Sequence, residues 1–195
     1  MNIFYLHHDP KLCAEMHTDK HVIKMILEYS QLLSTAHRVL DGQQTASVSK
    51  SGRLARRWTL PDARESMLYS ATHINHPSAV WCRLSKHNYI WLQSLLVELC
   101  KEYTYRYGKV HKCEETGLVS SLAQLPNNLK DLPFSEPTPA MPDEVKVSKD
   151  TGKFHYDSIA SYRNYYISNK QHLASWQGKV NSRNVPEWFR GETFN

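Results

Sequence analysis

Six polar side chains recur every three or four positions along an otherwise apolar stretch of the chain. They are His21, Lys24, Glu28, Gln31, Thr35 and Arg38. On a helix these positions fall within an arc of about 100°, and apolar residues occupy the adjoining face. A solvated face with charge pairs four residues apart explains many such ridges. Such a face usually carries several Lys and Glu, however, so one of each beside His, Gln, Thr and Arg points equally to an active site.

The start of the chain carries a second reactive group. Asn2 disfavours removal of the initiator methionine, so we expect the free α-amine on Met1, ahead of an apolar segment. Amino-terminal amines have a pKa of roughly 8, which leaves a neutral fraction able to form an imine with an aldehydic carbon. A solvated terminus without a role is the commoner case. Beside a reactive amine, a helical carboxylate would move protons or stabilise a sugar cation, and Glu28 is the candidate.

Two further segments suit a polyanionic partner. The polar segment 43–57 is predicted to be a flexible basic loop, and Lys50, Arg53, Arg56 and Arg57 in it are candidate phosphate contacts. The segment 102–112 combines aromatic and cationic groups that could stack on bases and hold phosphates. These groups are Tyr103, Tyr105, Arg106, Lys109 and His111. Ordinary capping of a helix end near Gly108 also explains part of this pattern.

Composition narrows the class of protein. The chain has 195 residues, a formal charge of +5 and a pI near 9.0, which modestly favours a polyanionic partner. This length suits one domain, 1–195, that needs no metal or disulfide to hold it. The four cysteines lie far apart, and no signal peptide is evident, so we expect reduced thiols in a cytoplasm. No stretch approaches 18 apolar residues, so we expect no membrane partner.

Eleven histidines raise the question of a metal site. His17 and His21 are four apart, as paired helical zinc ligands are, but no Glu follows His17 to complete an HExxH motif. His73 and His76 are three apart, yet His76 falls in a break before Pro77. Motifs for a serine nucleophile, a dinucleotide and a P-loop are absent as well. We therefore predict neither a metal nor a cofactor.

Helices must position nearly all of these groups. The periodicity predicts helices over about 10–17, 18–40, 61 or 62 to 74, 78 or 79 to 85, 87–107 and 156–176. An extended segment is expected at 2–6 and an irregular, proline-rich connection at 126–150. Asn75 and His76 precede Pro77, which disfavours a helical conformation at His76. The sequence thus predicts an all-α, single-domain bundle of about five to seven helices with a short extended amino-terminal segment.

Several of these features together resemble the phage endonuclease V type pyrimidine-dimer DNA glycosylases. The similar parts are the start at 1–6, the helix with Asp19-Lys20-His21 and Glu28 seven residues after His21, the region 79–99, and the aromatic pair Trp188-Phe189. The resemblance implies a small helical enzyme with the Met1 amine as nucleophile, Glu28 as catalytic carboxylate and His21 as a substrate contact. It also implies a phage origin, in the cytoplasm of an infected bacterium. The family's two arginines around the glutamate correspond here to Leu27 and Gln31, so those DNA contacts do not carry over.

The resulting expectation is a DNA-acting enzyme on a pyrimidine nucleotide, by glycosylase, lyase or related base-modification chemistry. The base would have to be flipped out of a duplex to be reached. Contacts with the nucleic acid or substrate are expected from Lys24, Gln31, Thr35, Arg38, Arg53, Arg56, Arg57, Asn75, His76, Tyr103, Tyr105, Arg106, Lys109 and His111. Two alternatives stay open at this point. One is an enzyme on free nucleotides, with or without a metal, and the other is a non-catalytic module that binds nucleic acid or a host protein.

Overall fold

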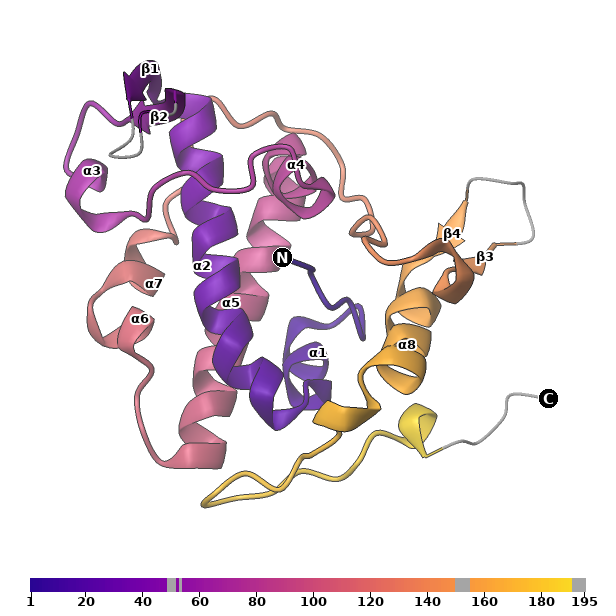
Figure 1. Ribbon diagram of the computed structural model, residues 1–195. Helices are drawn as coiled ribbons and strands as arrows, with labels where there is room; N and C mark the ends of the chain where they lie inside the picture. Colours follow the sequence, from indigo (N-terminus) through magenta and orange to yellow (C-terminus); the bar gives the residue numbers. More distant parts are fainter. Residues whose placement is uncertain (49–51, 53, 150–154, 191–195) are drawn as a thin grey trace.

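A computed structural model describes residues 1–48, 52, 54–149 and 155–190 (Figure 1). This part of the chain is mostly helical. It contains α1 (Pro10–Met16), α2 (Asp19–Asp41), α3 (Arg64–Met67), α4 (Pro77–Leu84), α5 (Lys86–Tyr107), α6 (Lys112–Glu115), α7 (Leu118–Ser121) and α8 (Ser158–Asn169). Three 3-10 turns, η1 (Asp143–Val145), η2 (Gln171–Leu173) and η3 (Glu187–Phe189), complete the helical elements. The helical expectation is confirmed in this general form.

Two small antiparallel sheets depart from the all-α expectation. One pairs β1 (Gln43–Val48) with β2 (Leu54–Thr59), and the other pairs β3 (Val147–Ser148) with β4 (Tyr156–Asp157). The first sheet replaces the flexible loop predicted at 43–57. It continues directly from the end of α2, where Gln43 pairs with Thr59.

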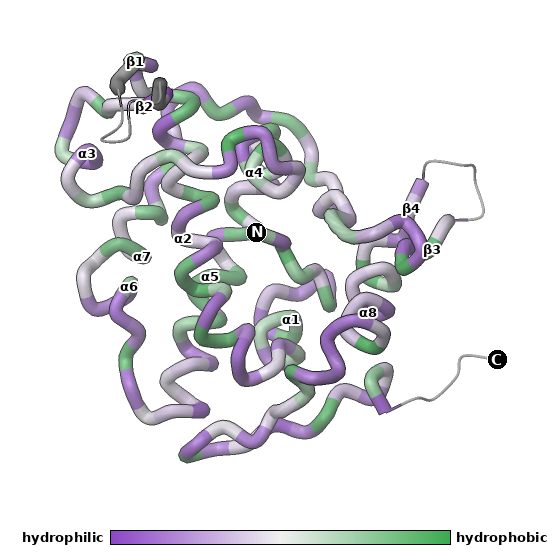
Figure 2. The backbone as a smooth tube through the Cα atoms, viewed as in Figure 1, coloured by the Kyte–Doolittle hydropathy of each residue, from purple (hydrophilic) through white to green (hydrophobic). Residues whose placement is uncertain are grey.

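The long helices α2 and α5 pack side by side and antiparallel at the centre of the molecule (Figure 1). Asp19 at the start of α2 contacts Arg106 near the end of α5, and His37 near the end of α2 contacts Tyr89 near the start of α5. The apolar stripe of α2 is fully buried from Val22 to Ala36. Helices α1 and α4 pack against this pair. Figure 2 shows hydrophobic residues gathered where α2, α5 and the amino-terminal segment meet.

The amino-terminal segment lies against α2, and the chain begins beside the middle of that helix (Figure 1). Residues Ile3 to Leu6 are buried, and the Phe4 N–H donates a hydrogen bond of 3.0 Å to the Tyr29 hydroxyl. The segment is irregular rather than a strand. Its apolar side chains still insert it into the core, which fixes the direction in which the chain begins.

Local signals set several helix boundaries as predicted. The Asp9 side chain caps α1 ahead of Pro10, and His76 caps α4 ahead of Pro77. Gly108 ends α5 with φ of 64°, in the left-handed region that favours glycine. The predicted helices at 10–17, 18–40, 78–85 and 87–107 are therefore confirmed to within about two residues.

Two predicted helices are wrong in extent. The helix expected up to Ile74 is only one turn, α3, and side chains of α2 bind the backbone that follows it. Arg38 binds the carbonyls of Leu68 and Tyr69, and Thr35 binds that of Thr72. The last helix ends at Asn169 rather than near residue 176. Trp176 instead donates a hydrogen bond to the Met16 carbonyl, which draws the tail across α1.

Candidate functional site

The polar ridge of α2 divides into a structural half and an accessible half. Arg38, 4% exposed, donates hydrogen bonds to the carbonyls of Trp58, Glu65, Leu68 and Tyr69 and to the Glu65 carboxylate. Thr35 is fully buried and both donates to and accepts from the backbone of Thr72. Arg38 and Thr35 therefore hold the segment that leads to the turn at residues 73–76. They do not face a substrate.

The accessible half centres on Glu28. Its carboxylate lies 3.1 Å from Lys24 Nζ, and the two side chains are 15% and 66% exposed. The lysine end of this pair is exposed to solvent while the carboxylate is largely covered, and the flexible Lys24 side chain can move away when another partner approaches Glu28. Gln31, three residues further along the same ridge, is half-buried.

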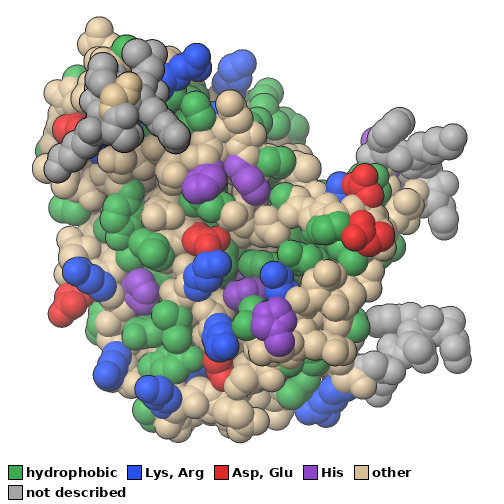
Figure 3. Space-filling model, in the orientation of Figure 1, with side chains coloured by type: hydrophobic (Ala, Val, Ile, Leu, Met, Phe, Trp, Pro, Cys, Tyr) green, Lys and Arg blue, Asp and Glu red, His purple; other side chains and the backbone are tan. Residues whose placement is uncertain are grey.

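The Met1 α-amine and Glu28 both act electrostatically on His76. The Ser78 N–H donates to His76 Nδ1 at 3.2 Å, so the neutral imidazole carries its proton on Nε2. Burial lowers the pKa of His76, the positive charges of the α-amine and His73 lower it further, and Glu28 raises it. The α-amine, Glu28 and His73 therefore lie within the range of electrostatic effects on His76, which is about 10 Å. Figure 3 shows two histidine side chains close to an acidic and a basic side chain on one face of the molecule.

The turn that carries both histidines is strained. Among the described residues, His73 is the one non-glycine residue with a positive φ, 48°. That conformation costs a non-glycine residue about 1 kcal/mol. The turn is held by a hydrogen bond of 2.8 Å from the His76 N–H to the His73 carbonyl and by a contact of 2.8 Å between the Thr72 hydroxyl and His73 Nδ1. The sequence does not mark His73 as a site residue, since a positive φ at a histidine has no local sequence signal.

His21 lies two turns before Glu28 on α2 and is buried. Its Nδ1 shares a hydrogen bond of 2.5 Å with the Tyr166 hydroxyl, and its ring stacks on Phe4 at 4.3 Å. Burial lowers the pKa of His21 to about 3, and the positive charges of Lys170 and Lys24, with the neighbouring His17, act in the same direction. His21 is therefore a neutral imidazole in positive surroundings, which favour an anionic ligand.

The aromatic and cationic groups of 102–112 lie elsewhere. Tyr103 packs against Tyr107 and His111, with ring centroids 5.1 Å apart in each case. His111 contacts the backbone of Ile23, five residues before Glu28 and so about 140° around the axis of α2. The structure does not bring these groups to the amino terminus. Lys109 is exposed at the end of α5, on the same segment.

Arg106 has a structural role, which differs from its predicted role as a nucleic-acid contact. It is completely buried and pairs with Glu102 at 2.6 Å and Asp19 at 2.9 Å, so it cannot contact DNA. It also donates to the carbonyls of His17 and Glu15. Its role is to join the start of α2 to the end of α5.

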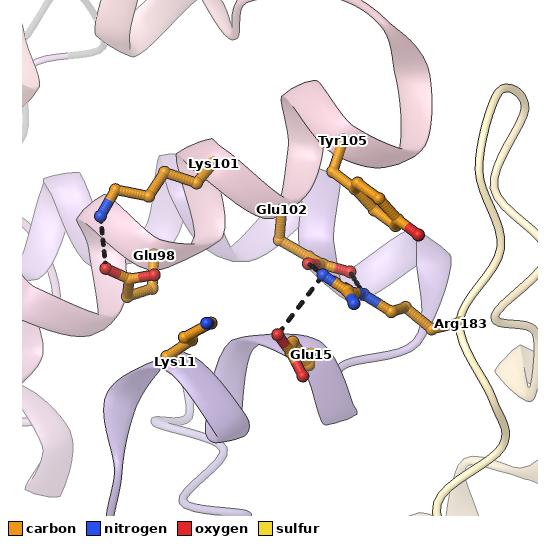
Figure 4. A pocket seen from close by; sticks show the side chains of 7 residues that line it. All are labelled: Lys11, Glu15, Glu98, Lys101, Glu102, Tyr105 and Arg183. Atoms are coloured by element: carbon orange, nitrogen blue, oxygen red, sulfur yellow. Dashed lines mark hydrogen bonds and ion pairs between the residues drawn. The ribbon is translucent and has the colours of Figure 1, made fainter.

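A charged cleft lies beside that junction, where the tail crosses α1 and α5 (Figure 4). It is lined by Lys11, Glu15, Glu98, Lys101, Glu102, Tyr105 and Arg183. Arg183 stacks on the Tyr105 ring at 4.1 Å and pairs with Glu102 at 2.9 Å. Burial alone would raise the pKa of Glu102, but its hydrogen bonds to Arg183 and Arg106 hold that pKa below the ordinary value. This cleft fastens the tail, since its ion pairs are satisfied internally.

The remaining predicted contacts are at the surface. Arg56 and Arg57 are exposed on β2, and Asn75 is exposed beside His76. Lys50 and Arg53 lie outside the described residues.

Three negative findings concern the described residues and the comparisons. In the described ranges, no three His, Cys, Asp or Glu side chains gather closely enough to hold a metal ion. No helix of that part of the chain is long and apolar enough to cross a membrane. Comparisons with protein families, curated protein sequences and solved structures find no match to this chain.

Proposed function

We propose that this protein is a DNA-acting enzyme that uses the Met1 α-amine and Glu28 for glycosylase and lyase chemistry on a pyrimidine nucleotide. The proposal is supported by the hydrogen bond from the Phe4 N–H to the Tyr29 hydroxyl, which holds the start of the chain against the turn of α2 that carries Glu28. The opposite effects of the α-amine and Glu28 on the pKa of His76 agree with this placement. These groups come from the amino-terminal segment, from α2 and from the turn before α4. The resemblance of the start of the chain and of the His21 to Glu28 step to pyrimidine-dimer glycosylases points to the same chemistry.

The first step is attack of the neutral amine on C1′ of the deoxyribose. A bond forms between the Met1 nitrogen and C1′ while the bond from C1′ to the base breaks, and the base leaves with that electron pair and takes a proton from solvent. Glu28 accepts one proton from the attacking nitrogen and returns it to the ring oxygen when the C1′–O4′ bond opens. The product is a protonated imine between Met1 and the sugar. Removal of a C2′ proton then breaks the C3′–O bond, and the phosphate leaves with its electron pair.

The surroundings suit the other parts of such a substrate. Lys24 and Lys170 supply positive charge near His21, where a backbone phosphate would lie. The amides of Gln31 and Asn75 flank Glu28 and His76 in sequence and offer donors and acceptors to a flipped-out base. Thr35 and Arg38 support the turn from behind.

Borohydride trapping tests the proposal directly. Incubation with a duplex containing an abasic site or a pyrimidine dimer, in the presence of borohydride, should yield a covalent adduct that mass spectrometry maps to Met1. A variant extended by two glycines before Met1 is the matched control, because it keeps every side chain but moves the amine. Absence of any adduct, or an adduct on a lysine, would remove the proposed mechanism.

A further inference from the structure

The β1–β2 ribbon, residues 43–48 and 54–59, is exposed on both of its faces where it is described. Paired residues share a face and successive residues alternate, so Ala46 and Arg56 lie on one face and Thr45 and Arg57 on the other. All four are exposed. A two-stranded ribbon that served its own core would bury one face, and an isolated ribbon is only marginally stable. Packing within this chain therefore does not account for the ribbon.

The base of the ribbon is nevertheless attached firmly to the end of α2. The Gly42 N–H donates to the Arg38 carbonyl at 2.9 Å, and a side chain at Gly42 would meet that oxygen at 2.4 Å. Arg38 also binds the Trp58 carbonyl, while the Glu65 carboxylate accepts from the Leu60 N–H at 2.7 Å. Both strands are thus held where they leave the body of the protein, and the ribbon stands at one end of α2 (Figure 1).

The charge of the ribbon points to a polyanionic partner that presents negative groups on two opposite sides. Arg56 and Arg57 point from opposite faces, and neither forms an ion pair with another described residue. The major groove of B-DNA is about 12 Å wide, admits a two-stranded ribbon and is bordered by phosphates on both sides. The corresponding groove of duplex RNA is deep and narrow, and side chains do not reach into it. We infer that the β1–β2 ribbon lies in the major groove of duplex DNA that flanks the target nucleotide.

The distance from Glu28 to the ribbon sets how many base pairs must flank the target nucleotide. This estimate rests on the proposed function, because it takes Glu28 as the position of the target. Gly42 follows Glu28 by fourteen residues along α2, or about 21 Å at 1.5 Å per residue. With α2 lying along the duplex, that length corresponds to about 6 base pairs at roughly 3.4 Å each. DNA with a shorter flank would reach the amino terminus but not the ribbon.

The test compares binding of two duplexes by fluorescence anisotropy, one with 4 and one with 14 base pairs on each side of an abasic site, with the full chain. The wild type should bind the long duplex more tightly, and R56A/R57A should lose about tenfold in affinity for the long duplex alone. Its salt slope on that duplex should fall by about 2, one for each phosphate contact. The matched control is K20A/K179A, which removes the same charge from two exposed lysines near the opposite end of α2 and should keep the advantage of the long duplex.

A charge-preserving variant and a competitor complete the experiment. R56K/R57K should retain most of the salt slope, which separates loss of charge from loss of the ribbon's structure. Retention of the long-duplex advantage by R56A/R57A, an equal loss in K20A/K179A, or equal competition by duplex RNA of the same length would each overturn the inference. Borohydride trapping on the short duplex measures the reaction of the Met1 amine without any contact between the ribbon and DNA. The proposed chemistry and the proposed ribbon contact can therefore fail independently.

Discussion

The Nδ1 atom of His21 lies 2.5 Å from the hydroxyl oxygen of Tyr166, although the two residues are 145 positions apart in the chain. This hydrogen bond joins α2 to α8 beside Phe4, whose ring stacks on His21 and meets the Tyr166 ring edge to face. Both partners are buried, and burial holds both of them neutral, since it lowers the pKa of His21 and raises that of Tyr166. The support of the candidate site therefore depends on a contact between the first third and the last part of the chain.

Replacement of Tyr166 by phenylalanine should lower the free energy of unfolding by about 1–3 kcal/mol, because it leaves the buried Nδ1 of His21 without a partner. Urea unfolding measures this change. Tyr165→Phe is the matched control, since the neighbouring hydroxyl forms no hydrogen bond with another described residue. Equal stability of the two variants would show that the His21 contact contributes nothing.

Glu28→Gln should slow formation of the borohydride-trapped adduct by about 10²–10⁴-fold, the usual range for loss of a general acid–base group. The dissociation constant for the same duplex should change little, because the amide keeps the size of the side chain. Glu98→Gln, in the charged cleft beside α5, is the control and should trap at the wild-type rate. Wild-type trapping by Glu28→Gln would exclude Glu28 from the chemistry.

Arg38→Ala should destabilise the protein by about 3 kcal/mol or more, because it removes the donor to four backbone carbonyls. Hydrogen exchange should accelerate most in residues 58–72, the segment that Arg38 and Thr35 hold. Arg57→Ala, an exposed arginine, should change stability by less than about 0.5 kcal/mol. A similar small change in Arg38→Ala would mean that the segment is held by other contacts.

Stability should fall as the pH drops below about 6.5, the ordinary pKa of histidine. Burial lowers the pKa of His17 and His37 to about 4 and that of His21 to about 3, so below pH 6.5 the unfolded state binds protons that the folded state does not. Each such histidine contributes about 1.4 kcal/mol per pH unit, until the pH reaches its pKa in the folded state.

The dependence is measured as the urea midpoint between pH 7.5 and 5, above the range where carboxylates with lowered pKa values, such as Asp41, add their own loss. His37→Gln should reduce the slope by about one proton, whereas replacement of the exposed His172 should leave it nearly unchanged. A flat midpoint over this range would contradict the assignment of three buried neutral histidines.

The amino-acid sequence by itself determined the central helices and most of their ends. The apolar spacing from Val22 to Ala36 marks the buried face of α2, and Asp9-Pro10 and Gly108 mark a start and an end. These features are local, since helix periodicity and capping involve residues within about one turn of each other. The same periodicity placed six polar residues on one ridge.

Only the tertiary structure decided which members of that ridge are available for chemistry. Arg38 and Thr35 bind a segment more than twenty positions away, and Arg106 is buried by partners nearly ninety positions away, so neither outcome follows from local spacing. The strained turn that carries His73 and His76 follows the segment that Arg38 and Thr35 bind. Contacts between distant positions depend on how the elements pack, and this packing holds the start of the chain against the turn of α2 that carries Glu28.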